Sequence, residues 1–96
     1  MSAGITLTTQ QEALLELADE IGSLETPMGD GLSQDCCGAR LIMRAGKMGG
    51  TVESVFGMNE SQLSRAIMLN KSIAPDSRNH TMANHLRNLV HSRVED

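Results

Sequence analysis

Phe56 is the only aromatic residue in this chain of 96 residues, and this restricts the kind of core that the chain can build. The core must be aliphatic, and the seven Met residues, together with many Leu, Ile and Ala, favour helices over strands. No segment alternates apolar and polar residues over the length of a strand. We therefore predict an all-α fold: one helical domain over residues 1–96, a small bundle of four to five helices that can include a helix-turn-helix.

Charge is sorted along the sequence. Residues 1–39 contain seven carboxylates and no Lys or Arg. Residues 40–94 contain all eight basic residues and three carboxylates, a net charge of +5. This separates an acidic helix, expected at 9–25, from a basic helical region at 33–94. A basic region can bind phosphate, an acidic partner or the acidic part of its own fold, and the sequence leaves all three open.

Two helices are expected in the first half of the chain. Thr9 and Glu12 form a T-x-x-E capping box, Leu7 is placed as a hydrophobic staple, and Pro27 ends this first helix. Ser33 is the expected cap of the second helix. Residues at helical spacing give the second helix a broad apolar face, formed by Cys37, Leu41, Ile42, Ala45 and Met48.

Three further helices are expected in the second half. A short helix over 52–56, capped by Thr51, ends at Gly57, where the chain turns. A fourth helix, 60–70, begins with an N-x-x-Q capping box at Asn59. The fifth helix is expected from Pro75, and its apolar stripe consists of Met82, Leu86, Leu89, Val90 and Val94.

The segment from Thr51 to Ile67 resembles the helix-turn-helix of bacterial and phage transcriptional regulators. Gly57, Met58 and Asn59 match the turn glycine, the apolar residue and the polar cap of that motif, and Leu63-Ser64-Arg65-Ala66 matches a run in its second helix. The resemblance implies that helix 60–70 reads bases in the major groove of DNA. The base-contacting residues would be Asn59, Ser61, Gln62, Ser64 and Arg65.

Basic residues near this helix are the candidates for contact with DNA phosphates. The predicted phosphate-contacting residues are Arg40, Arg44, Lys47, Lys71 and Arg78. The first three recur at i, i+4 and i+7, so they form one stripe on the second helix. The same stripe can instead be solvated, or can pair with the acidic face of the first helix. Because a single helix-turn-helix binds weakly, we expect a homodimer, with its interface on the apolar stripe of the first or fifth helix.

A second interpretation is a regulator that binds another protein without contacting DNA, such as an antiactivator, an adaptor or a phage-encoded inhibitor. The net charge of −4 favours it. So does Glu53, which stands where the motif normally has a small packed residue. Seven Met residues also suit an adaptable surface for a partner helix.

We predict neither an enzyme nor a metal or other cofactor site. The adjacent Cys36 and Cys37 have no evident catalytic base, and we expect both thiols to be reduced and buried. An intermolecular disulfide and a thiol-bound metal are the alternatives for this pair. The three histidines, His80, His85 and His91, do not share one helical face. No apolar run approaches the ~20 residues of a membrane span. The N-terminus also lacks the features of a secretory signal, so we expect no membrane partner and a cytoplasmic location.

Overall fold

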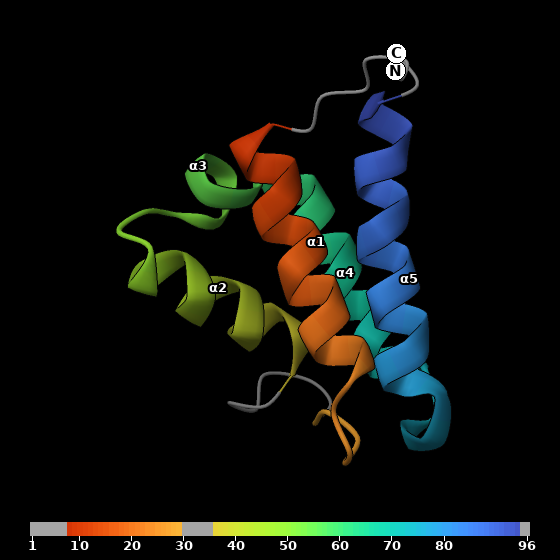
Figure 1. The fold of residues 1–96 in the computed structure, drawn as a ribbon. Coiled ribbons are helices and arrows are strands. Elements are labelled where there is room, and N and C mark those ends of the chain that lie inside the picture. Colours follow the sequence, from red (N-terminus) through yellow and green to blue (C-terminus); the bar gives the residue numbers. More distant parts are fainter. Residues whose placement is uncertain (1–7, 30–35, 95–96) are drawn as a thin grey trace.

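The computed structural model describes residues 8–29 and 36–94, with side chains as far as residue 91. Every regular element in these residues is a helix, which confirms the predicted all-α class (Figure 1). The helices are α1 (Thr9–Gly22), α2 (Cys37–Lys47), α3 (Val52–Phe56), α4 (Glu60–Ser72) and α5 (Pro75–Val94). Leu7 and Ser33, the predicted staple and cap, lie outside the described residues, and so does the side chain of Val94.

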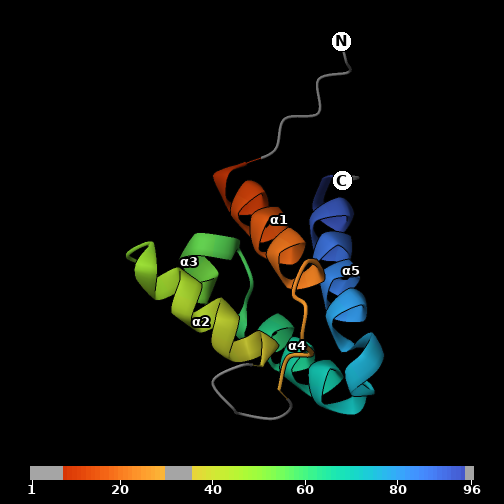
Figure 2. The ribbon, with the colours of Figure 1, turned by 60° about the horizontal axis from the view of Figure 1, so that its bottom comes forward.

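The core lies where α1 packs along α5 (Figure 1). Figure 2 shows α2 and α3 on the opposite side of α1 from α5, with α4 below them. Buried apolar side chains from all five helices fill the centre, among them Leu14, Leu17, Ile21, Leu41, Phe56, Ala66, Leu86 and Val90. In the part of the chain that the structure describes, the apolar stripe of α1 and the residues Met82, Leu86 and Val90 of α5 are packed within one chain, so these residues do not form the exposed dimer face that the sequence suggested.

The predicted capping box of α1 is wrong by one residue. Thr8 is the N-cap: its hydroxyl accepts from the Gln11 N–H at 3.1 Å, and Gln11 Oε1 accepts from the Thr8 N–H at 2.7 Å. Thr9 and Glu12 instead belong to the first turn of the helix. A threonine follows a threonine here and a glutamine precedes a glutamate, so the pattern fits either register. Gln11 is buried, which favours the register that gives its side chain a partner.

The predicted start of α2 at Ser33 is also wrong, because its N-cap is Cys36. The Sγ atom of Cys36 accepts a hydrogen bond from the Ala39 N–H at 3.4 Å. Sulfur is a weak acceptor, and cysteine is not among the residues preferred at an N-cap. The sequence signal therefore pointed to the nearest serine upstream.

The apolar face of α2 is narrower than predicted. Cys37, Leu41 and Ala45 recur every four residues and are fully or almost fully buried against the core. Ile42 and Met48, which the sequence placed on the same face, are 54% and 52% exposed. Because α2 packs mainly against α3 and α4, one stripe of its surface is covered and its flanks remain open to solvent.

The predicted starts of α3 and α4 and the turn at Gly57 are confirmed, whereas α4 continues two residues beyond the predicted end, to Ser72. Thr51 and Ser54 form a capping box on α3, and Gly57 ends that helix in a left-handed conformation with φ 70°. Asn59 Oδ1 accepts from the Gln62 N–H at 2.8 Å, and Gln62 Oε1 accepts from the Asn59 N–H at 2.9 Å. Two caps on either side of a left-handed glycine therefore determine this helix–turn–helix path.

Side chains from α4 and α5 form hydrogen bonds with the main chain of residues 28–29, which follow α1. Arg78, at 6% exposure, donates to the Met28 carbonyl oxygen at 2.6 Å and to the Ile73 carbonyl oxygen at 2.9 Å. Asn70 Nδ2 donates to the Gly29 carbonyl oxygen at 3.0 Å. The predicted contact of Arg78 with a DNA phosphate is therefore wrong, because its guanidinium binds main-chain carbonyls inside the protein.

Candidate nucleic-acid interface and the groove beside it

The α3–turn–α4 unit is held by apolar residues at the spacing of a helix-turn-helix. Val52, Phe56 and Met58 are buried, and Ala66 has no exposed surface. Leu63 is partly buried and packs against the same core. Together these residues hold the inner side of α4 against the body of the protein, so its other side faces solvent. The packing of α3, the glycine turn and the inner side of α4 thus leaves one face of α4 free.

Three of the predicted base-contacting residues lie together on that free face. Ser61, Ser64 and Arg65 are exposed and line a shallow hollow of about 600 Å³, shared with Met68, Leu69 and Ser72. Met68 is the most exposed large apolar side chain among the described residues, at 71%. Hydroxyls and a guanidinium on one helical face are groups that can donate to phosphates and to guanine.

The other two predicted base-contacting residues are differently engaged. The side-chain oxygens of Asn59 and Gln62 each accept a main-chain N–H in the capping box. Bidentate reading of adenine by an amide side chain uses both its oxygen and its NH₂ group. In this arrangement only the NH₂ groups are free for such a contact.

The predicted phosphate contacts do not converge on α4. Arg44 forms an ion pair with Glu20 of α1, and Arg78 is buried. Arg40 is half-buried, whereas Lys47 and Lys71 are exposed. The alternative in which the basic stripe pairs with α1 is thus realised for Arg44.

His85 of α5 lies near Arg65. Its half-buried position and the positive charge of Arg65 lower the pKa of His85 below its ordinary value of 6.5. The buried Nε2 atom of His85 has no hydrogen-bond partner among the described residues. Neutral imidazole is therefore the form that the folded protein favours.

The two cysteines are free and buried, as predicted. Burial, reinforced by the neighbouring Cys36, raises the pKa of the Cys37 thiol to about 12, and the charge of Arg40 opposes this only in part. The Cys37 thiol is therefore protonated near neutral pH and is a poor nucleophile. Within the described residues, no group of three or more His, Cys, Asp or Glu side chains is placed to hold a metal ion.

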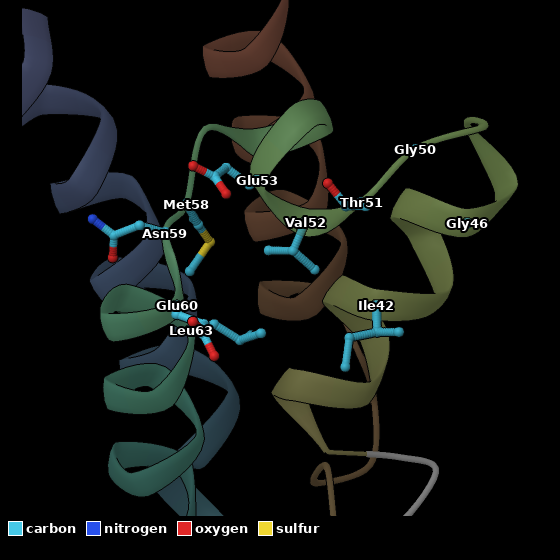
Figure 3. Close-up of a pocket in the computed structure, with 10 residues that line it drawn as sticks. All are labelled: Ile42, Gly46, Gly50, Thr51, Val52, Glu53, Met58, Asn59, Glu60 and Leu63. Atoms are coloured by element: carbon cyan, nitrogen blue, oxygen red, sulfur yellow. The ribbon is translucent and has the colours of Figure 1, made fainter.

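A groove that the sequence did not predict lies between α2, α3 and α4. It has a volume of about 580 Å³. Figure 3 shows Ile42 of α2 and Leu63 of α4 facing each other across it, with Val52 of α3 above. Glu53 and Glu60 lie along the same groove. Two features of the sequence bear on this groove: Glu53 stands at an unusual position of the motif, and Ile42 belongs to the predicted apolar face of α2 but is exposed in the structure.

No family model, curated protein or solved structure matches this chain. Among the residues that the structure describes, no helix is both long enough and apolar enough to span a membrane.

Proposed function

We propose that this protein is a small DNA-binding regulator that reads DNA with the exposed face of α4. The observation that carries the proposal is the α3–turn–α4 unit, with its left-handed Gly57, its buried Met58 and Ala66, and its free outer face. In proteins of this kind the second helix enters the major groove and the preceding helix crosses the DNA backbone. Such a unit acts as a dimer on paired half-sites, and we extend the proposal to a homodimer.

The polar residues on the free face of α4 have distinct roles in this proposal. Arg65 reads guanine, and the hydroxyls of Ser61 and Ser64 donate to phosphates or bases. Lys71, in the last turn of α4, and Lys47, at the end of α2, are the exposed lysines left from the predicted phosphate contacts. Asn59 and Gln62 contribute through their free NH₂ groups while they cap the helix.

The proposal is tested by fluorescence anisotropy of labelled DNA. The label is placed on the duplex because the protein has neither Trp nor Tyr. A generic duplex is titrated over a salt series, and a preferred duplex is then selected from a random pool. We expect Arg65→Ala to weaken binding of the selected duplex by ~1–3 kcal/mol.

The matched control is Arg87→Ala, which removes the same charge from a residue whose guanidinium pairs with Asp19 of α1 at 2.8 Å. Its affinity for the selected duplex should stay near that of the parent protein. Equal affinity of the Arg65→Ala variant and the parent protein would remove α4 as the reading helix. Absence of DNA binding at low salt would reject the proposal as a whole.

A second candidate function is a regulator that binds another protein, and a specific observation favours it. Glu60 lies in the first turn of α4, and Glu53 lies beside the same groove, so carboxylates occupy the end of the helix that would approach DNA. Carboxylates at that position repel phosphates. In this case the protein would bind its partner through the surface near α2, where Ile42, Met43 and Met48 are exposed.

A further inference from the structure

The groove between α2, α3 and α4 combines an apolar floor with open space beside it. Its apolar residues are Ile42, Val52, Met58 and Leu63, contributed by all three helices. The wall formed by α2 includes Gly46, where an added Cβ would meet no other atom within 4 Å. A side chain from outside can therefore approach the backbone of α2 closely at this point. Ile42 is more than half exposed, so part of this apolar surface is in contact with water.

The charged residues that line the groove are both acidic. They are Glu53, in the first turn of α3, and Glu60, in the first turn of α4. Neither carboxylate has an ion-pair partner within the parts of the chain that the structure describes. In contrast, two carboxylates on α1, those of Asp19 and Glu20, are paired with arginines. The groove thus presents unpaired negative charge next to exposed apolar surface.

We propose that this groove binds a basic amphipathic helix of a partner protein. One large apolar side chain of that helix enters between Ile42 and Leu63, and its flanking Lys or Arg side chains pair with Glu53 and Glu60. A helix is the form that matches a groove walled by helices, because the described residues offer no strand edge for an extended peptide. A second copy of the chain is the poorer occupant, since each copy carries a net charge of −4.

This inference goes beyond DNA reading and specifies the partner that the second candidate function would require. The probe is a fluorescein-labelled peptide of about 16 residues, long enough for four helical turns. Leu occupies one helical face at i, i+3, i+4 and i+7, and Lys occupies most other positions. A comparison peptide keeps every Leu and replaces each Lys with Glu. We expect saturable binding of the basic peptide, weakened by salt, and no binding of the acidic peptide.

Two variants locate the site. Gly46→Gln adds a side chain at a position that lines the groove and where an added Cβ meets no atom within 4 Å, and we expect it to weaken peptide binding by about tenfold or more, as for a central contact of an interface. Glu53→Gln with Glu60→Gln should weaken binding by about fivefold, as for two exposed ion pairs. The matched control is Glu12→Gln with Glu16→Gln, which removes the same charge from the exposed face of α1.

Amide spectra of ¹⁵N-labelled protein complete the test. Peptide binding should shift the signals of Gly46 and Gly50, which both line the groove. The proposal is overturned if the α1 control weakens binding as much as the groove variants, or if the glycine signals do not move. It is also overturned if sedimentation shows a dimer that Gly46→Gln dissociates, because the occupant is then a second copy. None of these variants alters Ser61, Ser64 or Arg65 on the free face of α4. Failure of the peptide-binding proposal therefore leaves the DNA proposal intact.

Discussion

Two glycines in α2 provide a direct test of how closely this helix approaches α4. Gly38 and Gly46 each lie one residue inside an end of the helix, and neither has a positive φ. A Cβ added at Gly38 would lie 2.5 Å from Cγ1 and 2.9 Å from Cδ1 of Ile67 in α4. A Cβ added at Gly46 would meet nothing within 4 Å. The same Gly→Ala exchange therefore separates helix propensity from packing.

The destabilisation expected for Gly38→Ala follows from these distances. Carbon atoms in favourable contact are about 3.5–4.0 Å apart, so the added methyl group would be about 1 Å too close to Cγ1. Ile67 is β-branched and has one strongly preferred χ1 in a helix, so its Cγ1 cannot rotate away at low cost. Overpacking of this kind costs about 1–3 kcal/mol, against a propensity gain of at most ~1 kcal/mol for replacing glycine. We expect Gly38→Ala to destabilise the protein by about 1–2 kcal/mol and Gly46→Ala to stabilise it slightly.

Urea unfolding followed by circular dichroism at 222 nm measures both variants. The Gly38→Ala variant should also melt roughly 4–16 °C below the parent protein, at ~4–8 °C per kcal/mol for a domain of this size. Combining Gly38→Ala with Ile67→Ala should give a smaller loss than the sum of the two single changes, because the clash is then removed. If Gly38→Ala is as stable as Gly46→Ala, the close approach of α2 to α4 is refuted.

Two further predictions concern titratable groups. The pKa of His85 in the folded protein lies below 6.5, so, as the pH falls, the unfolded chain binds a proton at this histidine before the folded protein does. The contribution of His85 to stability is therefore complete above about pH 6.5 and falls as the pH drops toward the pKa in the folded protein. The urea midpoint should therefore decline less between pH 7.5 and pH 5 for His85→Gln than for the parent protein. The control is His91→Gln, at an exposed histidine. An equal decline for His85→Gln and the parent protein would contradict the lowered pKa of His85. Because the raised pKa of Cys37, about 12, keeps this buried thiol protonated, a disulfide reagent at pH 8 should modify it only after denaturant is added. Rapid modification of the native protein would show that the α2 N-terminus opens.

Local patterns in the sequence were sufficient to predict where a helix begins when its capping residues lie close together in the sequence. Thr51 and Asn59 each have a partner three residues ahead, so α3 and α4 begin where the sequence predicts. The same reasoning chose the wrong register in α1, where two adjacent residues both qualified. It also failed at Cys36, whose role as a cap depends on a thiol as acceptor. Capping patterns thus predict a helix start reliably only where a single register satisfies them.

Long-range contacts explain the errors at the candidate sites. The sequence places Arg78 among the basic residues that follow helix 60–70, which predicts a contact with DNA phosphate. Its actual partner, the carbonyl of Met28, lies 50 residues away and was not predictable from local pattern. The groove depends in the same way on how α2 and α4 face each other. Ile42 differs from buried Leu41 by a single position, and only the packed structure decides which of the two enters the core.

The placement of the basic residues changes what a DNA titration should show. Arg78 binds main-chain oxygens, and Arg44 and Arg87 pair with carboxylates of α1, so these charges are engaged within the chain. The exposed lysines predicted to contact phosphate are Lys47 and Lys71. Each neutralised phosphate contributes ~0.9 to the slope with which the logarithm of the binding constant falls against the logarithm of the salt concentration. The two lysines therefore give a slope of about 2 per chain, and about 4 for a dimer. A much steeper dependence would show that further basic residues neutralise phosphates. If Arg44→Ala or Arg87→Ala then lowered the slope, the internal pairs would open on binding, which would make α1 part of the regulatory mechanism.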